Sequence, residues 1–302
     1  MRIALLGASG QVGWELQRAL VPFGEVIAVD RSVDIAEFAS VEASLVRLKP
    51  TVIVNAAAHT RVDEAECDPR PSLRTNAQGP AVLAEVAKRL CATLVHYSTD
   101  YVFDGRASVP YAEQARPNPL NAYGRSKLAG EEAIRISGCH HLILRTSWVF
   151  SARRSNFLRS ILAAARTREE LSVVDDQWGT PTGAELIADV SAHLLGALVA
   201  GRGDGGTYHL TAGGAVSRWE LARFLVHEAI RRGARLRLSV DGILSCKTSA
   251  SAACAPRPLN GLLDHRALEE TFGVQLPAWQ AGVLRVLDTW AEFDAWPRGE
   301  SV

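Results

Sequence analysis

A tyrosine and a lysine at helical spacing are the residues best suited to chemistry in this sequence. Tyr123 and Lys127 are four positions apart, so a helix would place both side chains on one face, one turn apart. A phenol exchanges protons poorly at neutral pH because its pKa is about 10, and an adjacent ammonium lowers that pKa. Thr99 would hold a substrate oxygen against the Tyr123 phenol. These residues predict proton transfer at a carbonyl or alcohol, although an exposed helix face is the alternative for the spacing alone.

A glycine-rich turn follows the first apolar run of the chain. Gly7, Gly10 and Gly13 separate a predicted strand at 2–6 from a predicted helix at 14–20. A strand, a glycine turn and a helix in this order are typical of dinucleotide binding, because backbone N–H groups then approach a pyrophosphate at the positive end of the helix. The spacing is Gly-x-x-Gly-x-x-Gly rather than Gly-x-Gly-x-x-Gly, and a tight turn without a ligand is the alternative.

The residues expected to discriminate between NADH and NADPH follow the second predicted strand, at 25–29. Asp30 is placed to hold the adenosine ribose hydroxyls, whereas Arg31 beside it would meet a 2′-phosphate. The alternative for Asp30 is a helix or turn cap. Asp34 and Ile35 follow where the next loop would touch adenine. The choice between NADH and NADPH therefore stays open, with Arg31 favouring NADPH.

Short apolar strands alternate with helical segments through the first 150 residues, which predicts an α/β fold with a Rossmann-type, doubly wound parallel sheet. We expect residues 1–150 to form an NAD(P)-binding domain and residues 151–302 to form mainly a smaller C-terminal substrate-binding lobe. Residues from about 183 to 212 are expected to return to the first domain, with a last sheet strand at 207–210. Residues 72–90 are expected to form one helix, and residues 239–258 a long surface loop.

Composition excludes several classes of protein. The 33 basic and 33 acidic residues balance, so no global field attracts nucleic acid or anionic lipid. The most apolar region, 186–200, is interrupted by Asp189 and His193, and a membrane span is not expected. The five cysteines include no Cys-x-x-Cys pair and indicate reduced thiols in a cytoplasmic protein. The histidines show no metal-ligand spacing, so no metal site is predicted from them.

Several blocks of sequence resemble the extended short-chain dehydrogenase/reductase family, and together they span nearly the whole chain. The blocks are residues 10–20, 54–60, 96–103, 123–131, 145–149 and 176–186, with shorter matches at 208–210, 257–258 and 276–280. The resemblance implies a reductase that uses NADPH or NADH. It further implies that the substrate is the nucleotide sugar dTDP-4-dehydro-L-rhamnose, whose 4-keto group is reduced, and that the C-terminal lobe binds this nucleotide sugar.

The resemblance also implies roles for single residues. Tyr123 would protonate the oxygen at C4, Lys127 would hold the nicotinamide ribose and lower the pKa of Tyr123, and Thr99 would hydrogen-bond the ketone. Asp100 and Trp148 would contact the sugar, although Trp148 could instead fill the core. The coenzyme would be lined by Gly7, Gly10, Gln11, Val12, Asp30, Arg31, Asp34, Ile35, Ala58, His59, Thr60, Tyr97, Tyr123 and Lys127.

The second lobe offers two further candidates for the substrate. A guanidinium matches phosphate geometry, so Arg257 is predicted to bind the diphosphate; a surface arginine in a loop is the alternative. Asn156 is predicted to frame the sugar or the base.

Magnesium and a homodimer are left open. Some members of the family are thought to dimerise through magnesium held by glutamates. Glu15 and Glu185 match two such positions, but Thr289, next to Asp288, stands at the third.

Two other functions remain as alternatives. One is another nucleotide-sugar reductase, epimerase or dehydratase on the same scaffold, and the other is a non-catalytic NADP-binding regulatory subunit. Dehydratases that resemble this fold usually carry Asp-Glu after the active-site threonine, whereas Asp100 and Tyr101 follow Thr99 here, which argues against dehydration. The presence of Thr99, Tyr123 and Lys127 together argues against a regulatory subunit.

Overall fold

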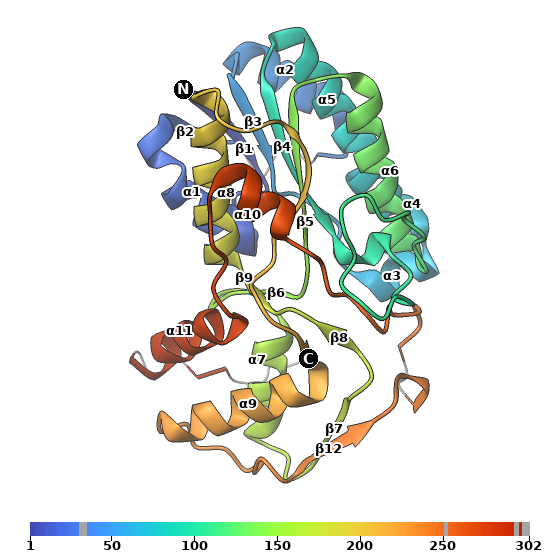
Figure 1. Ribbon diagram of the computed structural model, residues 1–302, viewed down its shortest axis with the longest axis vertical. Helices are drawn as coiled ribbons and strands as arrows, with labels where there is room; N and C mark the ends of the chain where they lie inside the picture. The colour runs from blue at the N-terminus through green and yellow to red at the C-terminus, as the bar shows by residue number, and fades with distance from the viewer. Residues whose placement is uncertain (30–34, 251–252, 293–295, 298–302) are drawn as a thin grey trace.

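A six-stranded parallel sheet forms the centre of the computed structural model (Figure 1), which describes residues 1–29, 35–250, 253–292 and 296–297. In spatial order the strands are β10 (Gly206–His209), β5 (His141–Thr146), β4 (Thr93–Thr99), β3 (Val52–Asn55), β1 (Arg2–Leu6) and β2 (Glu25–Ala28). Strand β2 lies on one side of β1, and the later strands β3, β4, β5 and β10 lie on its other side. The order therefore reverses between β1 and β3, and ligands of open α/β sheets bind at the carboxyl ends of the strands beside such a reversal.

Helices cover both faces of the sheet, which requires strands that are buried on both faces. Successive side chains of β1 point to opposite faces: Ile3 and Leu5 pack in one core and Ala4 and Leu6 in the other. The first face is covered by α1 (Gln11–Ala19), α8 (Ala184–Val199) and α10 (Arg266–Phe272), and the second by α2 (Phe38–Leu48), α5 (Gly79–Leu90) and α6 (Ala122–Ser137). The predicted doubly wound parallel sheet is confirmed, including a last strand at β10.

The predicted helix at 72–90 is interrupted. The structure has α3 (Val62–Cys67), α4 (Pro69–Leu73), a π-helical turn (Arg74–Gln78) and then α5. Pro80 has no N–H to give to the carbonyl of Asn76, so the regular ladder cannot continue there. The Asn76 carbonyl instead faces α6, where a Cβ on Gly130 would lie 2.1 Å from it. The π turn thus lets α6 pack unusually close to the chain.

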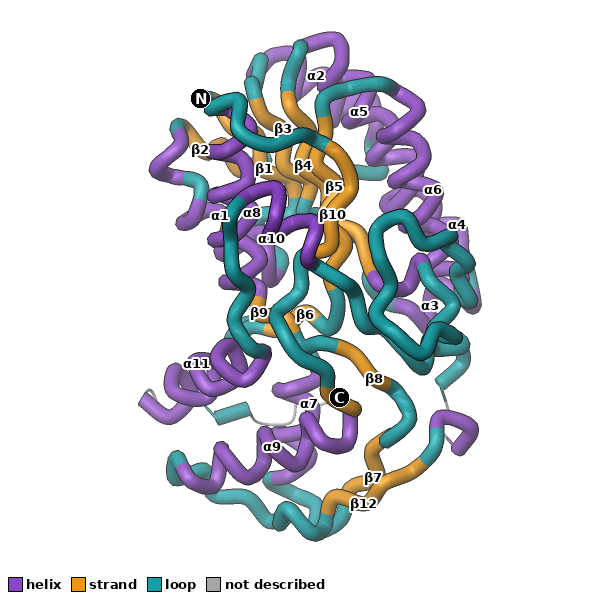
Figure 2. Tube along the Cα trace, in the orientation of Figure 1, coloured by secondary structure: helices purple, strands orange, loops and turns teal. Residues whose placement is uncertain are grey.

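A second lobe lies below the carboxyl edge of the sheet (Figures 1 and 2). Its own core is formed by Leu158, Leu162, Leu225, Val283 and neighbours, all buried. Its elements are α7 (Phe157–Ala165), β7 (Leu171–Val174), α9 (Arg218–Arg231), β12 (Ile243–Cys246) and α11 (Trp279–Glu292), with the two-residue strands β6 (Val149–Phe150), β8 (Trp178–Gly179), β9 (Thr182–Gly183) and β11 (Val216–Ser217). None of the helices in the described part of the chain combines the length and the apolar character that crossing a membrane requires.

The expectation of one long surface loop at 239–258 is wrong in its first half. Strand β12 pairs in parallel with β7, and Ile243 is buried in the second core. The four residues Ile-Leu-Ser-Cys are too few to show an alternation of apolar and polar residues, and the flanking Ser, Ala and Cys residues are typical of a loop. The segment is a strand because its backbone pairs with β7.

The glycine turn makes a prediction about folding. A Cβ at Gly13 would lie 2.0 Å from the Gly7 carbonyl oxygen, whereas one at Gly10 would lie 3.2 Å from the same atom. Gly13→Ala should therefore lower the free energy of unfolding by about 2–4 kcal/mol through overpacking, and Gly10→Ala by less than about 1 kcal/mol. Urea denaturation followed by circular dichroism measures both, and equal losses would contradict this reading of the turn.

Candidate active site

The glycine turn opens into a cleft at the carboxyl ends of β1 and β3. Gly7 has φ +73°, and a Cβ there would lie 2.5 Å from the backbone nitrogen of Ala57, so only glycine lets the two loops approach. The cleft has a volume of about 1190 Å³ and is lined by Leu6, Gly7, Ala8, Ser9, Gly10, Trp14, Gln17, Ala28, Val29, Ile35, Ala56, Ala57, Ala58, Thr75, Arg153, Arg154 and Arg159. Bare backbone at the start of α1 suits a pyrophosphate, so the residues present fit a dinucleotide.

The predicted coenzyme residues divide into three groups. Gly7, Gly10, Ile35 and Ala58 line the cleft, whereas Asp30, Arg31 and Asp34 lie outside the described residues. The others, which are not among the lining residues, are Gln11, Val12, His59, Thr60, Tyr97, Tyr123 and Lys127. The Tyr97 side chain lies in the core, where its hydroxyl donates to Ser191 Oγ over 2.8 Å.

Gln11 and Asn156 bind each other rather than standing apart as coenzyme and substrate residues. Asn156 Nδ2 donates to Gln11 Oε1 over 3.0 Å, and Ser151 Oγ donates to the same oxygen over 2.9 Å. Asn156 also caps α7, because its side chain accepts from the backbone N–H of Arg159. These contacts join the loop before α7 to the start of α1.

That loop and the first turn of α7 bring three arginines, which the sequence argument missed, to the coenzyme cleft. Arg154 Nε donates to the Ser9 carbonyl over 3.0 Å, and the Arg153 guanidinium lies 3.7 Å from the centre of the Trp14 ring. Arg159 Nη1 donates to the Ala152 carbonyl over 3.0 Å. They lie about 140 residues from the glycine turn along the chain, and only the packing of the loop after β6 shows that they belong to the cleft.

Helix α6 positions both Tyr123 and Lys127, and its first turn is held by two side chains. Asn121 Oδ1 accepts from the backbone N–H of Gly124 over 2.8 Å, and Glu66 Oε2 accepts from that of Ala122 over 2.6 Å. A helix leaves its first N–H groups without internal partners, so these two acceptors satisfy them. Tyr123 follows directly and is fixed at the carboxyl edge of the sheet.

Thr99 lies between Asp100 and Tyr123. The Thr99 hydroxyl donates to Asp100 Oδ1 over 3.0 Å, and it is close enough to the Tyr123 phenol to offset part of the rise in the pKa of that group. The backbone N–H of Tyr101 also donates to Thr99 Oγ1 over 3.2 Å. The structure thus brings together three residues that the sequence predicted to act together: Thr99, Asp100 and Tyr123.

The pKa of Tyr123 corrects one expectation. We expected the Lys127 ammonium to lower it, but burial raises the pKa of Tyr123 above its usual value, and the negative charge of Asp100 adds to the rise. The Lys127 ammonium is instead bound elsewhere: Nζ donates to the Tyr97 carbonyl over 2.6 Å and lies 3.1 Å from His96 Nε2. A phenol with a raised pKa stays protonated and is suited to giving a proton to a stronger base.

His96 and Asn55, neither of which was predicted, set the surroundings of Lys127. The backbone N–H of Ala57 donates to Asn55 Oδ1 over 3.2 Å, so the amide nitrogen of Asn55 faces His96 Nδ1 at 3.0 Å. Nδ1 then accepts, and the imidazole proton is on Nε2, directed at Lys127. This contact favours the uncharged amine, and burial acts in the same direction by lowering the pKa of Lys127 to about 8.

Trp148 lies between the lobes in a backbone conformation that a non-glycine residue seldom adopts, with φ +45°. Its ring covers Gly179, where a Cβ would lie 2.5 Å from the indole. The guanidinium of Arg218 lies 3.6 Å from the centre of the Trp148 ring and 4.7 Å from that of Phe157, which are cation–π distances. Arg218 was missed by the sequence argument because it reads as an ordinary surface residue at a helix start.

Arg257 pairs with an acid from the other lobe. Its Nη2 donates to Asp63 Oδ2 over 2.7 Å, and its side chain is only 16% exposed. Burial lowers the pKa of Arg218, and the charge of Arg257 adds to this effect. Burial raises the pKa of Tyr101, and the charges of Arg218 and Arg257 oppose that rise. Two guanidiniums, from Arg218 and Arg257, therefore converge beside Asp100 and Tyr101 at the junction of the lobes.

The glutamates that the resemblance associated with magnesium are paired with arginines. Glu185 binds Arg285, and Glu15 lies 3.8 Å from Arg18. Asp288, beside the third position, binds Arg232 Nε over 2.7 Å. Within the described ranges, no cluster of three or more His, Cys, Asp or Glu side chains is placed to hold a metal ion. These pairings do not fit a cation held by this set of residues.

Asp100 makes stability depend on pH. It is 3% exposed, and its Oδ2 has no hydrogen-bond partner among the described residues. Burial raises the pKa of Asp100 from the ordinary value of 3.8 to about 7. The folded state therefore binds more protons than the unfolded state between these values, so this group makes stability fall as pH rises from about 4 to about 7.

Asp100→Asn should remove this penalty and raise the free energy of unfolding at pH 8, by on the order of 2–4 kcal/mol more than at pH 4. Asp104→Asn is the matched control, because hydrogen bonds from Tyr111 and Asn118 lower the pKa of Asp104, and its loss should cost stability at pH 8. Guanidinium titrations at the two pH values measure both. A gain for Asp100→Asn that is the same at both pH values would contradict the buried-carboxylate argument.

Comparisons with known proteins agree with this geometry. A family model described as the RmlD substrate binding domain matches residues 1–292. A dTDP-4-dehydrorhamnose reductase from Shigella flexneri is 43% identical over 293 residues, which cover 95% of this chain and 97% of that protein. One from Burkholderia thailandensis is 43% identical over 288 residues, covering 94% and 97%. A solved dTDP-4-dehydrorhamnose reductase from Bacillus anthracis in complex with NADP has a TM-score of 0.87 and 31% identity, covering 95% of this chain and 99% of that one. The chain belongs to the RmlD family, that of the dTDP-4-dehydrorhamnose reductases.

Proposed function

We propose that this chain is a dTDP-4-dehydrorhamnose reductase, which reduces the 4-keto group of dTDP-4-dehydro-L-rhamnose to give dTDP-L-rhamnose. The observation that carries the proposal is the grouping of Tyr123 with Thr99 and Asp100 at the carboxyl edge of the sheet, where Thr99 is hydrogen-bonded to Asp100 and acts on the pKa of Tyr123. A cleft that fits a dinucleotide opens at the same edge. Relatives that are 43% identical along nearly the whole chain carry that name, and they support the choice of substrate.

Tyr123 is the proposed proton donor. NADPH or NADH, when bound in the cleft, supplies a hydride, and the ketone oxygen of the sugar then gains alkoxide character. Such charge must be met by a proton or a donor as it forms. An alkoxide is a stronger base than a phenolate, so a phenol kept neutral by burial loses its proton to it readily. Thr99 would hold the ketone oxygen against the phenol.

Asp100 is the proposed source from which Tyr123 regains its proton. Its pKa of about 7 leaves a substantial share of the carboxyl protonated at neutral pH. The hydroxyl of Thr99 is hydrogen-bonded to Asp100 and is close enough to Tyr123 to act on its pKa, so the proposed path passes a proton from Asp100 to Thr99 as Thr99 gives its own to Tyr123. The same carboxyl, with its unpaired Oδ2, would contact the sugar.

Arg218 and Arg257 are the proposed diphosphate site, with Trp148 against the sugar. Both arginines lie at the junction of the lobes, and each affects the titration of Tyr101. Guanidiniums bind phosphate oxygens in a fixed fork geometry. The pairing of Arg257 with Asp63 holds the Arg257 guanidinium in place until a phosphate competes for it.

We further propose a cytoplasmic location, since all five cysteines are free thiols, as expected for a reducing compartment.

Tyr123→Phe tests the proton donor. It should lower kcat by about 10²–10⁴-fold with little change in the affinity for NADPH, because it removes only the transferable proton. NADPH oxidation on adding the 4-keto-6-deoxy sugar nucleotide measures this. Tyr208→Phe is the control, since its hydroxyl donates to the Asp204 carbonyl at the outer strand and its loss should leave turnover unchanged. Tight NADPH binding without turnover in the unaltered protein would favour a regulatory subunit instead.

The arginines of the coenzyme cleft generate a second test. The double variant Arg153→Ala, Arg154→Ala removes two cations from the cleft and should raise the KM for NADPH by about 10–100-fold, the value of one or two charge-assisted hydrogen bonds. The KM for the sugar nucleotide should stay within about twofold. The control is Arg168→Ala, which alters an exposed arginine three residues after the end of α7 that does not line the cleft. Initial rates at constant ionic strength measure both constants, and a matching rise in the two KM values would refute the assignment.

A further inference from the structure

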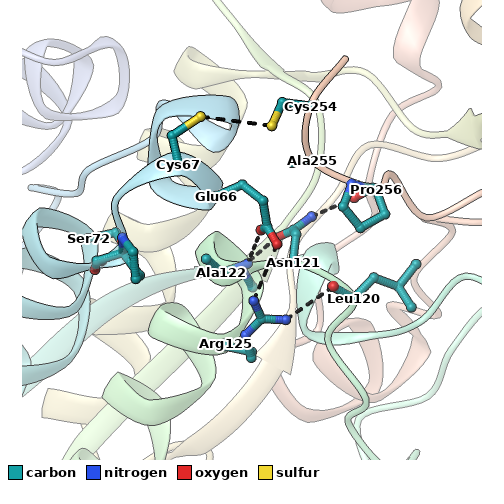
Figure 3. A network of polar contacts seen from close by, with 12 residues as sticks. Glu66, Cys67, Ser72, Leu120, Asn121, Ala122, Arg125, Cys254, Ala255 and Pro256 are labelled. Atoms are coloured by element: carbon teal, nitrogen blue, oxygen red, sulfur yellow. Dashed lines mark hydrogen bonds and ion pairs between the residues drawn. The ribbon is translucent and has the colours of Figure 1, made fainter. Parts of the chain in front are cut away.

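Two cysteines that are 187 positions apart along the chain lie side by side at the surface. Cys67 is the last residue of α3, and Cys254 lies in the segment 253–258, here called the strap. Their sulfur atoms are 3.8 Å apart, and both residues are exposed. Figure 3 shows the two side chains pointing toward each other from the helix and from the strap.

The strap is bound to α3 and to the start of α6 by polar contacts beside this pair. Asp63 Oδ1 accepts from the backbone N–H of Ala255 over 3.0 Å, and its Oδ2 accepts from Arg257 over 2.7 Å. Asn121 Nδ2 donates to the Pro256 carbonyl over 2.8 Å (Figure 3). These contacts hold Cys254 near Cys67, so the sulfurs meet through the fold and not through a chance approach of two loose segments.

We propose that Cys67 and Cys254 form a reversible disulfide that tethers the strap to α3. A protein sulfur bond of this kind needs about 2.05 Å, so the sulfurs must approach by less than roughly 2 Å, which side-chain rotation and a small movement of the strap supply. Neither cysteine is used by the proposed chemistry. Intracellular disulfides of this kind are usually transient and serve redox sensing.

The oxidant is a small-molecule disulfide, for which oxidised glutathione is the probe. The thiolate of one cysteine attacks a glutathione sulfur and releases one glutathione thiolate, giving a mixed disulfide. The second thiolate then attacks the protein sulfur and releases the other glutathione. Two protein thiols lose two protons and two electrons, and one oxidised glutathione becomes two reduced molecules.

The groups around the pair make this oxidation slow at neutral pH. The hydrogen bond with Cys67, the charge of that cysteine, and the carboxylates of Asp63 and Glu66 raise the pKa of the Cys254 thiol. Arg257 and Arg125 partly offset the two carboxylates, since each pairs with one of them. The thiolate is the attacking species, so the rate of disulfide formation should rise with pH.

Peptide mapping of the full-length protein tests the bond directly. After treatment with oxidised glutathione, a non-reducing digest should contain the Cys67 peptide joined to the Cys254 peptide, with two free thiols lost. Dithiothreitol should restore both. Cys67→Ser and Cys254→Ser should each abolish the joined peptide, whereas Cys91→Ser, which alters another exposed cysteine, should leave it unchanged. Only mixed disulfides with glutathione, or only bonds between molecules, would overturn the proposal.

Thermal unfolding tests whether the bond acts as a tether. Closing a long loop stabilises a protein mainly through the unfolded state, so the oxidised protein should unfold about 3–8 °C higher than the reduced one. Cys67→Ser should show no such shift under the same treatment. A joined peptide without any shift would contradict a tethered strap.

One consequence rests on the function proposed above. The strap carries Arg257, and a tether fixes it beside Asp63, so oxidation should raise the KM for the sugar nucleotide severalfold without changing the KM for NADPH. Cys67→Ser should remove this redox dependence. The joined peptide and the thermal shift need no turnover, so failure of the proposed function leaves them unaffected, whereas their absence defeats the tether alone. A joined peptide and a thermal shift with an unchanged KM would overturn the proposed link between strap and substrate.

Discussion

The close approach of α6 to its neighbours is the constraint on which the site depends. A Cβ at Gly124 would lie 2.2 Å from the Tyr101 carbonyl, and one at Gly130 would lie 2.1 Å from that of Asn76. Only glycine permits a helix to lie so near the main chain. The result is that Lys127, 2% exposed, reaches the Tyr97 carbonyl of β4, and Tyr123 reaches Thr99 at the end of the same strand. A small outward shift of α6 would separate both pairs.

The second lobe completes the site because its residues reach back to the sheet. Trp148 leaves β5 in a left-handed conformation, and the guanidinium of Arg218 stacks on its ring while compensating part of the charge on Asp100. Burying a carboxylate is costly unless a cation or a donor faces it. Asp100 keeps a raised pKa even so, which indicates that the compensation is partial. The strain at Trp148 and the incomplete pairing of Asp100 both lie where the substrate is proposed to bind, as is common for functional sites.

The sequence predicted the parallel sheet and the residues proposed to react, but it did not predict the side chains that surround those residues. Periodicity located the strands because parallel strands are buried on both faces, and the spacing of Tyr123 and Lys127 located one face of α6. His96 could not be assigned a role in advance, because its role depends on the orientation of the Asn55 amide across the sheet. Arg218 lies in the second lobe, about 95 positions beyond Tyr123, and no local pattern distinguishes it. The short strand β12 was not predicted for a similar reason, because it forms only by pairing with β7, about 70 positions earlier in the chain.

The direction of the acid–base chemistry also follows from packing and not from residue types. Tyrosine beside lysine suggests a phenolate, which would serve to remove a proton from an alcohol. In the folded chain, burial lowers the pKa of Lys127 only to about 8, and burial keeps Tyr123 protonated. A neutral phenol is poised to give a proton, which is the requirement of ketone reduction. The burial of α6 against β4 thus keeps the phenol in the protonated form that a developing alkoxide requires.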